Sequence, residues 1–319
     1  MAVLYIDRRG TVLTVERAAL MIREPEARPR TVPLHMIERL VLVGDVRVSA
    51  AVLTRLAALD CSVSCLPGRG RSGGVHLSGM SHGDVGRRIA QYRLSVDPAA
   101  RSVWVRQLIH LRLAGQRRLL GKGLRSQPAE RLALHRAMHQ VRAAMHALRD
   151  PQLRVEQMRG HEGAATQAFF AGYRVMLPPA AGFDGRNRRP PRDPVNAALS
   201  LGYTLSHGDA LRAIQRAGLD PTLGLLHEPH HGRDSLACDL NELARSRIEW
   251  LVWRLFAEQT LRSDDFHPQP DGAVWLGKAG RERFYACYEQ HAGTHRRWLQ
   301  QAAGFLARTL SAGEEALND

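Results

Sequence analysis

The chain is poor in cysteine and lysine and has no long apolar run. Its four cysteines include no C-x-x-C pair, so the sequence indicates neither a zinc ribbon nor a disulfide framework. No segment approaches the ~18 apolar residues that a membrane span requires. The N-terminus becomes charged at Asp7 and lacks the apolar core of a signal peptide. We therefore expect a cytoplasmic protein with free thiols and no membrane association.

Arginine, by contrast, is present in large excess. Only Lys122 and Lys278 are lysine among 45 basic residues, which outnumber 31 acidic residues and give a formal net charge of +14. Such a surplus attracts polyanions and makes nucleic acid the expected partner. Arginine binds phosphate through two parallel hydrogen bonds, which suits this role. A GC-rich genome explains the preference for arginine over lysine equally well.

The first part of the chain, residues 1–85, has the pattern of a β domain. Two short β-branched runs, at residues 3–6 and 11–15, flank Arg9-Gly10 and predict a hairpin. Further strands are expected at residues 31–34, 37–43, 46–49 and 61–66, and a short helix at residues 50–59. The arginine–glycine loop at residues 67–74 is either a DNA contact or a mobile hairpin tip.

From residue 86 onward the pattern changes to long helical periods. Apolar residues recur at spacings of three and four, with arginines on the polar face. Asp193-Pro194 is a typical helix start, with a capping carboxylate and proline at the first helical position. Helices are expected at residues 103–120, 130–148, 151–177, 193–217 and from 278 onward, with a short hairpin near residues 272–276. A further helix is expected to hold Asp239 and Glu242 and to end at about residue 261. The length of 319 residues is consistent with two domains.

One stretch, residues 224–242, carries the clearest chemical pattern. His227 lies in a loop broken by proline and glycine, and Asp239 and Glu242 follow on a predicted helix. Because positions i and i+3 share a helix face, both carboxylates are expected to point toward one place. Carboxylate oxygens with one imidazole suit Mg²⁺ or Mn²⁺, the ions that enzymes place against phosphates. The stretch therefore predicts a metal site for phosphodiester chemistry.

The same stretch also matches the H-E-x-x-H pattern of zinc proteases, at residues 227–231. That motif requires a continuous helix, on which two histidines bind zinc and the glutamate acts as base. Pro229 disfavours the helical conformation of Glu228 and removes a backbone donor, and Gly232 follows. A zinc-protease site is therefore not expected.

Four stretches together resemble the CRISPR-associated integrase family, the endonuclease and integrase of spacer acquisition. They occur in the family's order and at its spacing. These stretches are Glu162-Gly-Ala-Ala, residues 188–203 (RRPPRDPVNAALSLGY), residues 218–229 (GLDPTLGLLHEP) and Asp239-Leu-Asn-Glu242. Glutamate stands at the second acidic position where some members have aspartate, which preserves charge and hard-oxygen ligation.

The resemblance implies a fold and a site. It implies an α+β protein with an N-terminal β-sandwich-like domain (residues 1–85) that forms a homodimer, followed by an α-helical catalytic domain (residues 86–319). It implies Mg²⁺ or Mn²⁺ held by Glu162, His227 and Glu242, with Asp239 as a further ligand or a neighbour that supports them.

The implied activity is insertion of new DNA segments into a CRISPR array. The implied partners are double-stranded DNA, as spacer precursor and CRISPR repeat, and a small ferredoxin-fold CRISPR-associated protein. The expected DNA contacts are Arg186, Arg188, Arg189, Arg192 and Tyr203. Two alternatives remain open: a nuclease of branched DNA that acts in repair, and a non-catalytic nucleic-acid-binding scaffold whose acidic cluster is a network of ion pairs.

Overall fold

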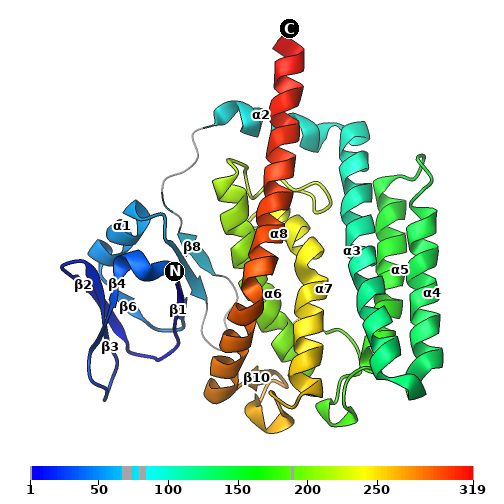
Figure 1. Ribbon diagram of the computed structural model, residues 1–319. Helices are drawn as coiled ribbons and strands as arrows, with labels where there is room; N and C mark the ends of the chain where they lie inside the picture. Colours follow the sequence, from blue (N-terminus) through cyan, green and yellow to red (C-terminus); the bar gives the residue numbers. More distant parts are fainter. Residues whose placement is uncertain (1, 67–73, 78, 80–83, 188–189, 319) are drawn as a thin grey trace. The chain divides into compact units, whose positions relative to one another are not determined.

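The chain consists of strands followed by helices, as the expected mixed α+β class requires (Figure 1). The computed structural model describes the backbone of residues 2–66, 74–77, 79, 84–187 and 190–318. It divides into two compact units, residues 1–83 and residues 84–319. No helix among the described residues is both long enough and apolar enough to cross a membrane.

The first unit contains two four-stranded sheets. One sheet has the order β1-β5-β7-β8, made of β1 (Ala2–Ile6), β5 (Ile37–Val43), β7 (Ser62–Leu66) and β8 (Val75–Leu77). Strands β1, β5 and β7 are parallel, and β8 is antiparallel to β7. The nearly continuous apolar run of β5 is typical of a central strand in a parallel sheet.

The second sheet corrects one expectation. It has the order β4-β3-β2-β6, made of β4 (Arg30–Pro33), β3 (Ala19–Arg23), β2 (Val12–Glu16) and β6 (Arg47–Val48). The predicted hairpin at Arg9-Gly10 is wrong, because β1 and β2 belong to different sheets. Backbone amides explain why: Gly10 donates to Asp45 and Arg47 donates to Thr11, both at 2.9 Å, so the turn leads the chain toward β6.

A helix and an apolar core complete this unit. Helix α1 (Ala50–Ala58) and the short 3₁₀ helix η1 (Leu34–Met36) lie between strands in the sequence. The core draws on both sheets and on α1: its members include Ile6, Leu13, Leu20, Leu40, Val52, Leu56 and Val63. Both sheets therefore contribute to one buried cluster. The predicted arginine–glycine loop lies almost entirely outside the described residues, which omit 67–73.

The second unit is mainly helical, with a two-stranded antiparallel sheet, β9 and β10. Its elements are α2 (Val85–Val96), α3 (Pro98–Ser126), η2 (Pro128–Glu130), α4 (Arg131–Ala147), α5 (Val155–Arg174), η3 (Pro179–Ala181), α6 (Pro194–Arg216), α7 (Ser235–Ala257), η4 (Ser263–Asp265), β9 (Phe266–Pro268), β10 (Val274–Leu276) and α8 (Lys278–Asn318). Asp193 caps α6 as expected, because its side chain accepts from the Asn196 amide at 2.8 Å. Helix α2 was not expected, and α7 ends four residues before the predicted position 261.

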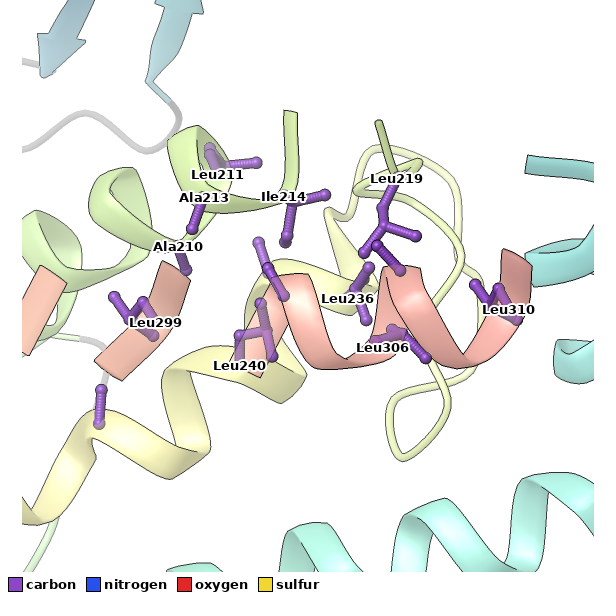
Figure 2. Packing of buried hydrophobic residues seen from close by; sticks show 14 residues of the cluster. Ala210, Leu211, Ala213, Ile214, Leu219, Leu236, Leu240, Leu299, Leu306 and Leu310 are labelled. Atoms are coloured by element: carbon purple, nitrogen blue, oxygen red, sulfur yellow. The ribbon is translucent and has the colours of Figure 1, made fainter. Parts of the chain in front are cut away.

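Two packed groups of helices form this unit. Helices α3, α4 and α5 contact one another, and α6, α7 and α8 do the same. Figure 2 shows the core of the second group, to which α6 contributes Leu211 and Ile214, α7 contributes Leu240 and α8 contributes Leu306. Helices α3 and α7 connect the groups. They approach closely, since a Cβ at Gly115 would clash with the Ser246 side chain.

Candidate active site

The loop before α7 is organised around one buried carboxylate. Asp239 has no exposed surface. Its Oδ2 accepts the amides of Leu225 and Leu226 at 2.6 and 3.0 Å, and its Oδ1 accepts the His227 amide at 2.8 Å. A charged acceptor with three backbone donors is a strong local anchor. Asp239 therefore defines the course of the loop that carries His227.

The same carboxylate orients the His227 ring. Asp239 Oδ1 lies 2.7 Å from Nδ1 of His227. Because a carboxylate only accepts hydrogen bonds, Nδ1 is the donor in this contact, and in a neutral ring the lone pair is then on Nε2. Histidines that bind metals are commonly held in this way by a carboxylate. The His227 side chain is about one-third exposed, with 32% accessibility.

Neighbouring residues hold the loop from outside. Gly224 allows the backbone to pass against Ser235 at the start of α7, where any Cβ would clash. Arg101 of α3 donates to the Leu225 carbonyl at 2.7 Å, and Glu228 accepts from Arg101 and Arg159 at 3.2 Å. Hydrogen bonds from these two arginines lower the pKa of Glu228. Residues 227–231 are not helical, so the H-E-x-x-H pattern is not a zinc-protease site.

The other two predicted acidic residues meet at a buried arginine. Arg112 of α3 is 1% exposed, and its Nε donates to Glu162 Oε1 of α5 at 2.9 Å. Its Nη1 lies 2.8 Å from Glu242 Oε2 of α7. Burial alone would lower the Arg112 pKa, but nearby carboxylates, led by Glu242, outweigh burial and raise it. Three helices therefore converge on one guanidinium.

Each of these carboxylates has a second partner. The Thr166 hydroxyl, one turn along α5, donates to Glu162 Oε1 at 2.8 Å. Arg245, on the same helix as Glu242, lies 3.1 Å from Glu242 Oε1. Asp239 and Glu242 do share a helix, but their carboxylates contact different groups: Asp239 contacts the loop amides and Glu242 the two arginines. The expectation that they point toward one place is therefore not met.

A further buried carboxylate that acts on Arg112 was not predicted from the sequence. Glu249 of α7 is completely buried and accepts the Tyr203 hydroxyl at 2.9 Å. Burial raises its pKa, while Arg112 and the Tyr203 hydrogen bond act in the opposite direction. Arg112 was also missed, although it occupies the apolar face of α3 with Val105 and Ile109. A charged residue at such a position signals a buried ionic partner.

The residues predicted to contact DNA differ in how far they are buried. Tyr203 is 8% exposed and its hydroxyl faces Glu249, so burial and Glu249 raise its pKa far above 10. Arg186 donates to Asn196 at 2.6 Å and lies over the Tyr203 ring at 5.4 Å. Arg192 is exposed. Arg188 and Arg189 lie outside the described residues.

The ligand atoms of the predicted metal site are of the types that bind a hard divalent cation. Glu162 and Glu242 are carboxylates that pair with the buried guanidinium of Arg112, and the His227 ring is oriented by Asp239. Asp239 does not fit a ligand, because both of its oxygens are occupied by the loop. Across the part of the chain that the structure describes, no three His, Cys, Asp or Glu side chains form a ready metal-binding group. Arg112 occupies the position between the two glutamates.

Known proteins resemble this chain over nearly its whole length. The family described as "CRISPR associated protein Cas1" matches residues 4–290. A relative from Thermodesulfovibrio yellowstonii, named CRISPR-associated endonuclease Cas1 1, is 34% identical over 97% of this chain and 98% of its own. A relative of the same name from Chlorobaculum tepidum is 31% identical over 90% of this chain and 85% of its own.

Solved structures share the fold at lower identity. A CAS1 protein from Thermotoga maritima has a TM-score of 0.83 at 19% identity, covering 97% of both chains. A casposase bound to its integration product has a TM-score of 0.82 at 19% identity, covering 97% of this chain and 91% of that one. In a Cas6-RT-Cas1–Cas2 complex the score is 0.82 at 21% identity, covering 98% of this chain and 35% of that one. From the family match and the curated relatives, the chain belongs to the CRISPR-associated Cas1 family.

Proposed function

We propose that this protein is a metal-dependent DNA endonuclease and integrase that inserts DNA segments into a CRISPR array. The observation that carries the proposal is that Arg112 of α3 joins Glu162 of α5 to Glu242 of α7, and Glu242 lies about one helical turn from Asp239, which orients the His227 ring. The names of the curated relatives support endonuclease activity. The casposase whose fold it shares was captured with an integration product, which supports strand transfer.

In this proposal Glu162, His227 and Glu242 hold Mg²⁺ or Mn²⁺. The bound ion would polarise a phosphoryl oxygen and favour deprotonation of the attacking hydroxyl. Asp239 orients the His227 ring through its contact with Nδ1. Buried Glu249 and Tyr203 support Arg112 and Arg245 from the protein interior. In this proposal these neighbouring side chains hold the proposed metal ligands in position and balance their negative charge.

The proposed substrate is double-stranded DNA, as spacer precursor and CRISPR repeat. The net charge of +14 supports binding of a polyanion. Exposed Arg192 and, with a change of conformation, Arg186 are the proposed phosphate contacts, which position DNA without reading its sequence. The Cas6-RT-Cas1–Cas2 complex, whose Cas1 part shares this fold, includes Cas2. We propose a Cas2-type protein as the partner, which the resemblance described as a small ferredoxin-fold protein.

The nucleophile provides the test of this function. The protein and its partner are incubated with Mn²⁺, duplex DNA bearing free 3′-hydroxyls, and a target that carries the repeat. Strands are expected to join at the repeat ends, because the 3′-oxygen attacks the repeat phosphodiester and its former 3′-oxygen leaves. A dideoxy terminus should prevent joining and spare hydrolytic nicking, since water can replace the missing nucleophile.

Gel analysis of labelled strands distinguishes the alternatives. Nicking without joining, even with the correct partner and repeat, would favour the branched-DNA nuclease. Absence of both reactions, with DNA binding intact, would favour the non-catalytic scaffold. Equal joining from dideoxy and hydroxyl ends would refute attack by the 3′-oxygen. Metal dependence is checked in parallel by adding EDTA.

The two sheets of the first unit are the basis of a proposed dimer. We propose that they form a β-sandwich-like domain and that residues 1–85 mediate a C₂ homodimer, because strand edges left unpaired invite pairing with a second copy. Light scattering at micromolar concentration in moderate salt should give twice the chain mass of 35.5 kDa. A mass of one chain under these conditions would contradict the dimer.

A further inference from the structure

Arg112 is buried at a cost that its partners must offset. It is 1% exposed and shares the apolar face of α3 with Val105, Leu108 and Ile109. A buried charge is destabilising by several kcal/mol unless it is paired and hydrogen-bonded. Its nearest anions, Glu162 and Glu242, come from two other helices, α5 and α7. The arginine therefore joins three helices at one point.

The shape of the side chain matters as much as its charge. The guanidinium is planar and presents five N–H donors in a fixed fork. In the structure Nε donates to Glu162 Oε1 at 2.9 Å, while Nη1 forms an ion pair with Glu242, 2.8 Å from its Oε2. A lysine ammonium carries the same charge at one point. It is less suited to hold two carboxylates that approach from different helices.

The carboxylates around Arg112 are already paired with guanidinium groups. Three carboxylates, those of Glu162, Glu242 and Glu249, act on Arg112. Arg112 and Arg245 both place a guanidinium group against Glu242. Glu162 and Glu242 together carry as many charges as Arg112 and Arg245, and burial raises the pKa of Glu249. Arg112 already engages both Glu162 and Glu242, so a divalent cation that binds these two carboxylates must displace it.

We propose that Arg112 is a positioning residue that holds Glu162 and Glu242 together in the absence of metal and competes with a divalent cation for the same two carboxylates. This inference rests on the proposed function, because it takes these glutamates as the metal ligands. It goes further by making metal affinity and the stability of the helix junction depend on one residue of α3. A purely structural ion pair would not couple to Mn²⁺ in this way.

The test uses the full chain with Arg112→Met, which removes the charge and keeps an apolar side chain of similar length. Arg117→Met is the matched control, because Arg117 is exposed on the same helix. Melting temperature is measured in EDTA and in MnCl₂, and Mn²⁺ affinity is measured from the electron paramagnetic resonance signal of the free ion. Neither readout requires enzymatic activity.

Arg112→Met is expected to melt several degrees lower in EDTA, because two facing carboxylates lose their shared counter-ion. It should bind Mn²⁺ at least about tenfold more tightly than the unmodified protein, a difference of about 1.4 kcal/mol. Its gain in melting temperature on adding Mn²⁺ should be correspondingly larger. Arg117→Met should match the unmodified protein in both measurements.

Arg112→Lys keeps the test decisive if the methionine variant does not fold in EDTA. Lysine retains the charge but loses the fork, so Mn²⁺ affinity should rise less than in Arg112→Met and still exceed that of the unmodified protein. Equal or weaker Mn²⁺ binding in the folded variants would overturn the competition and leave the proposed metal site intact. Absence of Mn²⁺ binding in every protein would overturn both.

A double substitution identifies the carboxylate through which Arg112 acts. In a Glu162→Gln background, the competition over that carboxylate is absent, so Arg112→Met should change Mn²⁺ affinity less than it does in the unmodified background. Glu156→Gln, an exposed position on the same helix, is the control background and should leave the full effect of Arg112→Met. The same effect in both backgrounds would show that Arg112 does not act through Glu162.

Discussion

Alanine at Glu162, His227 or Glu242 is expected to abolish Mn²⁺-dependent DNA cleavage. Each substitution removes one proposed metal ligand, and the phosphodiester then loses the charge stabilisation on which the reaction depends. We expect a loss on the order of 10³-fold or more in cleavage rate, which corresponds to more than about 4 kcal/mol of transition-state stabilisation. Rates are measured on a labelled duplex at saturating Mn²⁺.

Two controls separate chemistry from folding. Glu162→Gln and Glu242→Gln keep the side-chain shape and an oxygen that can accept from Arg112, so their inactivity cannot be assigned to a lost contact alone. Glu156→Gln changes an exposed carboxylate on the helix of Glu162 and should remain active. DNA binding, followed by fluorescence anisotropy, should persist in all of them. Cleavage that survives any two of the alanine substitutions would show that the assignment is wrong.

Asp239→Asn is expected to destabilise the fold as well as to impair cleavage. The carboxylate accepts three backbone amides and the His227 ring in a fully buried position. An amide group of the same size places an N–H donor where an acceptor is needed, so buried donors lose their partner. Each such loss costs about 1–3 kcal/mol, and we expect a total of about 3–5 kcal/mol.

Denaturant titration measures this loss, with Glu228→Gln as the control. Glu228 lies in the same loop, but its side chain is 57% exposed, and exposed ion pairs contribute about 0–1 kcal/mol. Cleavage by Asp239→Asn should fall about 10–100-fold even where the protein is folded, because the His227 ring loses its orientation. A fully stable variant with an unchanged cleavage rate would refute this role for Asp239.

Local sequence was sufficient for most of the elements, though not for β3 or α2, and for several chemical details. Apolar spacing located most helices of the second unit, and Asp193-Pro194 identified the start of α6. The pattern of proline and glycine correctly excluded a helix at residues 227–231. These features depend on neighbouring residues, through capping, backbone restriction and periodicity, so they can be inferred without knowing the fold.

The partners of the site residues required the tertiary structure. The spacing of Asp239 and Glu242 placed them on one helix. In the fold, however, the Asp239 carboxylate accepts the backbone amides of the loop at residues 225–227, while the Glu242 carboxylate pairs with Arg112. The pairing of β1 with β5, and not with β2, is a similar long-range choice. Arg112 meets Glu162 and Glu242 across 50 and 130 positions of sequence. Periodicity can mark Arg112 as buried, but only the packing of three helices decides which carboxylates balance its charge, because an ionic contact depends on distance in space.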